Sequence, residues 1–129
     1  MNREAILTAL AARIDARRAP WPSIPAYLPY TLLADGQETV TDRQYDQALL
    51  TLILGVRRAA RATSDATRSS EANALLEALI VETLGTDRTL GGECLDLYYL
   101  EGNTEYPTDG TDLIGATAVF AVDYARDFE

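Results

Sequence analysis

The sequence predicts an α+β domain, built on a mainly antiparallel sheet of about four or five strands with two helices packed on one face. Three observations predict this class. The most apolar run, 47–60, alternates as a central strand does, and a second alternating segment, 113–126, follows near the end of the chain. Two other segments carry apolar residues at helical spacing. A chain of 129 residues fits one domain spanning 1–129.

The first helix is expected over residues 2–18. Asn2 can cap its N-terminus, and Glu4 lies in the first turn, where negative charge is favourable. Its arginines crowd the C-terminal end, which suits the helix dipole. One face of the helix is apolar and comprises Ile6, Leu7, Leu10 and Ile14.

Residues 19–25 carry three prolines and predict a rigid loop, with Trp21 pinning that loop to the core. Residues 26–34 are expected to form a strand at an edge or a bulge, because the proline within it cannot donate to a ladder. The Asp-Gly pair at 35–36 predicts a tight turn. Residues 37–40 would then form a short return strand.

The central strand is expected over 47–60. Leucines alone would also allow a helix, but alternation favours a strand with one dry and one mixed face. The run is shorter than the roughly 20 apolar residues needed to cross a membrane. The dry face would comprise Ala48, Leu50, Leu52, Leu54 and Val56.

The second helix is expected to begin at a cap formed by Ser69 or Ser70 and to end at Gly85. Its apolar stripe comprises Ala72, Leu75, Leu76, Leu79, Ile80 and Thr83. A strand over 93–100, a polar and acidic loop over 102–112 and the alternating strand over 113–126 complete the chain.

Composition limits the function classes. Lys plus Arg number 11 and Asp plus Glu 20, so the formal net charge is −9, and every basic residue is arginine. An acidic chain argues against nonspecific binding to nucleic acid or to an anionic membrane surface. The N-terminus lacks the pattern of a signal peptide, so we expect a protein made and folded in a cytoplasm.

The sequence offers no motif for catalysis. There is no histidine, which rules out Ser-His-Asp and Cys-His catalysis and argues against a structural zinc site. Cys94 is the only cysteine, so we expect an inert thiol and no internal disulfide. The acidic cluster of Glu101, Glu105, Asp109 and Asp112 does not match the calcium-loop pattern, and it is either a solvated loop or a weak cation site. We therefore expect neither an enzyme nor a bound cofactor.

The order of segments carries a resemblance that covers nearly the whole chain without a short diagnostic motif. An N-terminal helix precedes WPSIPAYLPYTLLADGQETV and YDQALLTLILGVRRA, and a second helix precedes ECLDLYYLEG and IGATAVFAVDYARDF. In this layout the chain resembles the tail terminator, or minor tail protein U, family of long-tailed bacteriophages. Head–tail joining and tail-completion proteins of the phage neck share a similar size and layout and are the nearest alternatives.

The resemblance implies a structural virion protein without an active site. Such proteins form a ring, expected to be a hexamer, on the last ring of the tail tube protein. They stop tube polymerisation and offer a surface to the head-completion or connector protein, while DNA passes through the lumen without specific binding. The expected location is the head-proximal end of the virion tail, after assembly in the bacterial cytoplasm. An uncharacterised small enzyme or ligand-binding domain and a cellular adaptor are the remaining alternatives.

Subunits of a closed ring meet through two different patches, and the sequence holds opposite charges in separate segments. Arginine suits such interfaces because its planar guanidinium can hold a carboxylate at two points. One hypothesis is that the arginines contact an acidic surface of a neighbouring subunit or of the tube; the other is that they are solvated or paired within their own subunit. The residues concerned are Arg57, Arg58, Arg61, Glu105, Asp109 and Asp112.

Overall fold

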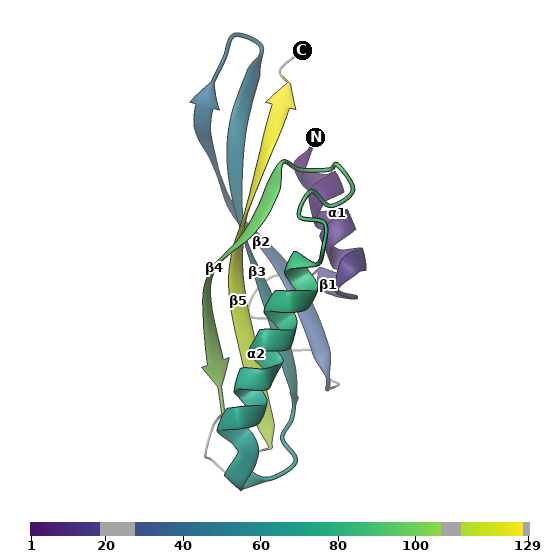
Figure 1. The fold of residues 1–129 in the computed structure, drawn as a ribbon, viewed down its shortest axis with the longest axis vertical. Helices are drawn as coiled ribbons and strands as arrows, with labels where there is room; N and C mark the ends of the chain where they lie inside the picture. The colour runs from purple at the N-terminus through teal and green to yellow at the C-terminus, as the bar shows by residue number, and fades with distance from the viewer. Residues whose placement is uncertain (19–27, 107–111, 128–129) are drawn as a thin grey trace.

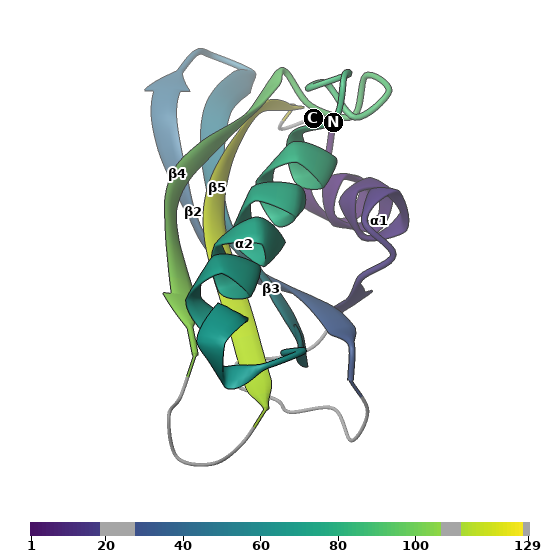
Figure 2. The same ribbon diagram turned by 60° about the horizontal axis from the view of Figure 1, so that its bottom comes forward.

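The structure is a computed structural model that describes residues 1–18, 28–106 and 112–127. Its strands form one sheet in the order β1-β2-β3-β5-β4, parallel between β1 and β2 and antiparallel elsewhere. Both helices lie on the same face of the sheet (Figure 1, Figure 2), which confirms the predicted α+β class. The elements are α1 (Arg3–Arg13), β1 (Arg17–Arg18), β2 (Tyr30–Arg43), β3 (Gln47–Arg61), a 3₁₀ helix (Asp65–Thr67), α2 (Arg68–Leu84), β4 (Asp96–Glu105) and β5 (Leu113–Asp127).

The centre of the sheet is the antiparallel pair β3 and β5, which match along their whole length. Over 48–56 of β3 and 114–124 of β5, every second residue faces the helices and is at most 3% exposed. The faces expected for both strands from the alternation are therefore confirmed. These residues are Ala48, Leu50, Leu52, Leu54 and Val56 of β3 and Ile114, Ala116, Ala118, Phe120, Val122 and Tyr124 of β5.

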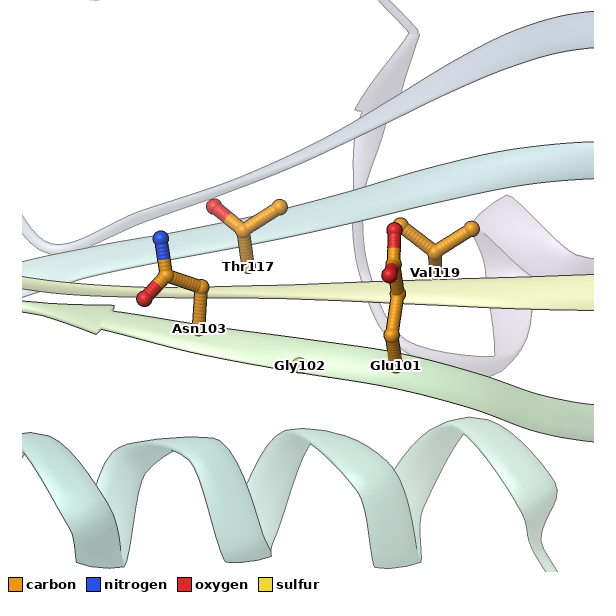
Figure 3. A pocket seen from close by; sticks show the side chains of 5 residues that line it. All are labelled: Glu101, Gly102, Asn103, Thr117 and Val119. Atoms are coloured by element: carbon orange, nitrogen blue, oxygen red, sulfur yellow. The ribbon is translucent and has the colours of Figure 1, made fainter.

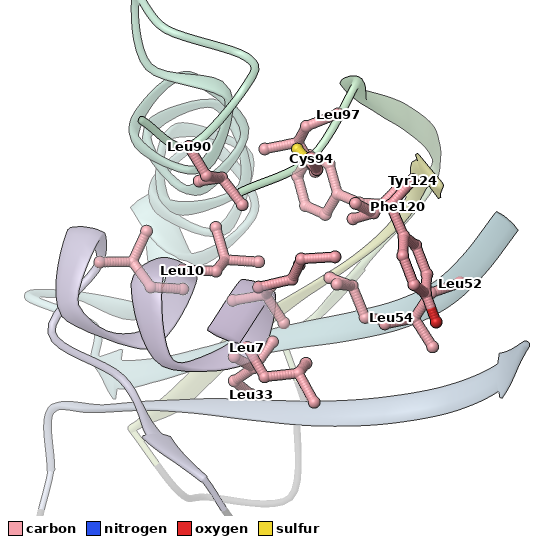
Figure 4. Close-up of a cluster of buried hydrophobic side chains, with 14 of the residues drawn as sticks. Leu7, Leu10, Leu33, Leu52, Leu54, Leu90, Cys94, Leu97, Phe120 and Tyr124 are labelled. Carbon is pink, nitrogen blue, oxygen red and sulfur yellow. The ribbon is translucent and has the colours of Figure 1, made fainter. Parts of the chain in front are cut away.

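The apolar core fills the space between the sheet and the helices. Figure 4 shows side chains from α1, β2, β3 and β5 converging there. The T-shaped contact between the rings of Tyr99 and Phe120, with centroids 5.7 Å apart, closes it on the β4 side. Leu79 of α2 is fully buried, whereas Leu76 is only partly buried against the same cluster. Burial of this apolar surface is the main force that holds the helices on the sheet.

The first helix is shorter than expected. Asn2 caps it, since its side-chain oxygen accepts a hydrogen bond from the Ala5 amide at 2.8 Å. The helix ends at Arg13, and Asp15 then takes a positive φ of 50°, which an aspartate tolerates and which no helix can continue. Arg17 and Arg18 therefore leave the expected helix and pair with β2 as β1.

The second helix matches the expectation at its end but not at its start. Its start is wrong: Thr67, not Ser69 or Ser70, holds the N-cap position, because a 3₁₀ turn precedes the helix. Its end is confirmed at Gly85, where φ is 59°. Arg13 of α1 also donates to the carbonyls of Thr83, at 3.3 Å, and of Leu84, at 3.0 Å, which satisfies carbonyl groups that a helix end leaves open.

The tight turn expected at 35–36 is wrong. β2 runs on to Arg43, and a shift of register between Asp35 and Glu38 absorbs the Asp-Gly pair as a bulge. A Cβ added at Gly36 would lie 2.8 Å from the Ile53 carbonyl oxygen. Glycine therefore allows β2 and β3 to approach each other closely at this position. The hairpin instead turns at residues 44–46, and the expected return strand 37–40 is the outer part of β2.

The acidic loop expected over 102–112 is also partly wrong, because β4 continues to Glu105. A register shift between Tyr99 and Glu101 keeps the strand paired with β5 beyond the apolar segment. Asp112 lies just before β5. The proline-rich loop 19–25 with Trp21, and Asp109, lie outside the described residues. Within the described ranges, no helix is long and apolar enough to cross a membrane.

Candidate interaction surface

Arg57 lies on the sheet face opposite the helices and is tied to its own chain. Its two terminal nitrogens donate to the two carboxylate oxygens of Glu105 at 2.8 and 2.7 Å. Its Nε donates to the Tyr30 hydroxyl at 3.4 Å, and the Arg57 side chain is only 16% exposed. The hydrogen bond from Arg57 lowers the pKa of the Glu105 carboxyl, and the same contact raises the pKa of Arg57. The pair is thus a two-point, charge-assisted contact.

The other two arginines of the group are also paired within the chain. Arg58 lies on the helix face of β3 and bonds the Glu82 carboxylate of α2 and the Thr31 hydroxyl. Arg61 donates to both carboxylate oxygens of Asp112 at 3.0 Å. The Arg61 and Asp112 side chains are largely exposed, so this pair contributes roughly 0–1 kcal/mol.

The structure thus brings together four of the six residues singled out from the sequence, as the pairs Arg57–Glu105 and Arg61–Asp112. Arg58 pairs with Glu82 on the other face of the sheet, and Asp109 is outside the described ranges. Glu82 is the partner that sequence reasoning missed, because it lies on the polar side of a helix and no pattern in the chain points to β3. Contact of these residues with a neighbouring subunit or the tube stays a prediction, and any such contact would have to add to pairs already formed.

A second surface lies at the end of the β2–β3 hairpin, which extends beyond both helices (Figure 1). We call Val40, Arg43 and Tyr45 the hairpin tip. Val40 is 53% exposed and Tyr45 is completely exposed. The Arg43 side chain is exposed, and it makes no ion pair with any described residue. Aromatic and arginine side chains are the types enriched at the centres of protein interfaces.

A third surface is the free edge of the sheet at β4. We call Tyr99, Leu100 and Glu101 the β4 edge patch. Tyr99 is 38% and Leu100 47% exposed, on a strand whose outer backbone groups have no neighbouring strand in the described structure. The bulge between Tyr99 and Glu101 leaves Leu100 without a partner residue on β5. An edge with exposed apolar side chains is a template for pairing with another chain.

A shallow hollow of about 440 Å³ adjoins this patch on the open face of the sheet. Figure 3 shows Glu101, Asn103, Thr117 and Val119 projecting away from α2 into it. The Glu101 carboxylate makes no ion pair within the described ranges. The hollow therefore offers a carboxylate, an amide and a hydroxyl to a cationic or polar group from outside.

The reactive residue types offer no other constellation in the described part of the chain. Cys94 is 2% exposed, and burial raises the pKa of its thiol to about 11, so it is protonated and unreactive near neutral pH. Asp87 accepts from the Thr89 amide and hydroxyl and from the Gly91 amide, which lowers its pKa to about 2 and orders the loop after α2. The described residues contain no group of three or more His, Cys, Asp or Glu arranged to hold a metal ion.

Comparison with known proteins shows similarity in structure. No protein-family model and no curated protein sequence matches the chain. The fold is similar to a chain of the structure "Virion of native gene transfer agent (GTA) particle", with 21% sequence identity and a TM-score of 0.44. The match covers 91% of this chain and 84% of that chain.

Proposed function

We propose that this chain is a structural protein of a phage virion, and specifically a tail terminator whose subunits form a ring, expected to be a hexamer, on the end of the tail tube. The ring would stop tube polymerisation and provide the surface on which the head docks. Its partners would be further copies of the chain, the tail tube protein and a head-completion or connector protein.

The observation that carries the proposal is that one chain has two separate, different surfaces suited to protein contacts. The hairpin tip is a projecting arm with an exposed tyrosine and arginine, and the β4 edge patch is an open strand edge with exposed apolar groups. A closed ring requires two different patches on each subunit. The α+β layout agrees with the layout implied by the sequence resemblance.

The charge of the chain supports the same proposal. A formal charge of −9 suits a ring through which DNA slides. Attraction between DNA phosphates and basic side chains would slow the passage of the DNA, and an acidic chain offers little such attraction. The acidic side chains Asp96, Glu101 and Asp123 lie on the strands β4 and β5, where the sheet has no helix over its outer face.

The test is deletion of the gene from the phage or prophage genome that carries it, with complementation from a plasmid. Electron microscopy of the deletion strain is expected to show headless tails of excessive length, and complementation is expected to restore virions. Tails of normal length that fail to join heads would contradict termination and favour a head–tail joining role. Normal virions from the deletion strain would contradict a virion function of any kind.

A further inference from the structure

The hairpin tip and the β4 edge patch are complementary in charge and in chemistry. The tip supplies a guanidinium, an exposed phenol ring and an aliphatic group, from Arg43, Tyr45 and Val40. The patch supplies the Glu101 carboxylate on the open face of the sheet, the exposed Leu100 at the bulge, and Tyr99, whose ring lies on the helix side against Phe120. Neither the guanidinium nor the carboxylate has an ion-pair partner in the described ranges.

Backbone groups support the same pairing. β1 pairs with β2 only at Leu32 and Leu33, and Arg3 donates to the Gly36 carbonyl, so the outer side of β2 is open in the described structure only from Gln37 to the hairpin. The outer side of β4 is open as well. Two open strand edges on one chain can add to each other between copies, and alternate side chains then set the specificity.

The charges favour a contact between different patches over a contact between identical ones. A symmetric contact of two hairpin tips would place two Arg43 guanidinium groups in one small interface, and a symmetric contact of two patches would place two Glu101 carboxylates in one interface. Like charges placed opposite each other disfavour association. A tip-to-patch contact removes both clashes, and it leaves each copy with one unused tip or patch for the next copy.

We propose that the hairpin tip of one copy docks on the β4 edge patch of the next copy, with the Arg43 guanidinium on the Glu101 carboxylate and the Tyr45 ring against Leu100. The inference rests on the proposed ring and names the surfaces that build it. The repeated contact has a single direction around the assembly, as closure of a ring requires. Arg57 and Arg61 take no part in it, since their carboxylate partners lie in their own chain.

The experiment compares self-association of the full chain and its variants by native mass spectrometry and sedimentation over a wide concentration range. Arg43→Glu and Glu101→Arg are each expected to weaken association at least about tenfold, and the double exchange is expected to recover part of the loss. Tyr45→Ala is expected to weaken it by a similar factor. Arg88→Glu is the matched control, because Arg88 is an exposed arginine outside both surfaces, and it should leave association unchanged.

Folding is checked for each variant by circular dichroism and thermal unfolding, and exposure of all the substituted side chains favours normal folding. Association of Arg43→Glu and Tyr45→Ala at wild-type strength would overturn the inference, as would a wild-type chain that is monomeric at every concentration. Equal weakening by the Arg88→Glu control would overturn it too, because the effect would then be one of net charge.

The inference and the proposed function fail in different ways. If the tip variants complement the deletion strain and give tails of normal length, the docking contact is wrong while the terminator function stands. If the chain associates through these two surfaces but its deletion leaves virions normal, the contact stands and the terminator function is wrong.

Discussion

Truncation of Leu52 tests the assignment of the two faces of the central strand. Its side chain is 0% exposed and lies in the core beneath the helices, with Val122 opposite on β5. Leu→Ala at buried sites lowers the free energy of unfolding by about 2–5 kcal/mol. Because the neighbours of a fully enclosed site on a central strand can move little into the cavity, we expect a loss of about 3–4 kcal/mol. For a chain of this size that loss lowers the melting temperature by roughly 10–15 °C.

Leu49→Ala is the matched control for this measurement. Leu49 lies on the same strand, points to the opposite face and is only half-buried. The lower β-propensity of alanine affects both variants alike, so the difference between them reports burial. We expect Leu49→Ala to cost about 1 kcal/mol.

The assay is urea unfolding followed by circular dichroism, with the free energy of unfolding compared at an unchanged dependence on urea concentration. Equal losses in the two variants, or a Leu52→Ala loss below about 1 kcal/mol, would refute the assignment of the dry face.

Three further predictions concern the thiol, the loop after α2 and the arginine pairs. Alkylation of Cys94 followed by mass spectrometry should rise with a midpoint near pH 11, and a midpoint near the ordinary value of 9.0 would contradict its burial. Because its folded pKa is lowered, Asp87 contributes stability that is fully present above pH 3.8 and lost as pH falls through about 2. The difference in urea midpoint between wild type and Asp87→Asn should therefore shrink over that interval, and a constant difference would argue against it. The last prediction concerns charge reversal of Arg57 and Arg61 to Glu, in a protein shown to be folded. If these residues contact a neighbouring subunit or the tube, the complementation assay should show overlong headless tails. Tails of normal length would limit these arginines to pairing within the chain.

The parts of the fold that were predictable from sequence are those with a long, uninterrupted period. β3 and β5 are 15 residues long each and place apolar residues at alternate positions over 48–56 and 114–124, so a one-residue slip would turn this apolar face to solvent. The Asp-Gly pair was misleading because glycine serves turns and bulges equally well. What decides between them is the neighbouring strand: continuing β2 past Gly36 gains pairing of Glu38, Thr39 and Val40 with β3.

The candidate surfaces were less predictable for a related reason. Arg57 and Glu105 are 48 positions apart, and they meet only because the bulge in β4 sets the register that places Glu105 opposite Gly115, next to the arginine. Residue types identified the arginine group and the acidic segment, but partners depend on registers that no local pattern encodes. The exposure of Tyr45 followed from the true position of the hairpin turn, which the sequence placed ten residues too early, at about 35–36.

The pairing of β3 with β5 has a consequence for how the chain folds. β3 is the middle strand of the finished sheet, yet one of its two neighbours is the last strand to be synthesised, and contacts such as Thr51 with Asp123 join residues 72 positions apart. Until β5 arrives, the hairpin of β2 and β3 has an open inner edge rich in leucine. Pairing across such separations carries a large loop-closure cost, so folding is slow and the half-made sheet is exposed to aggregation. Because an open leucine-rich edge can pair with other chains, dilute, slow synthesis should give a higher yield of folded protein than rapid overexpression.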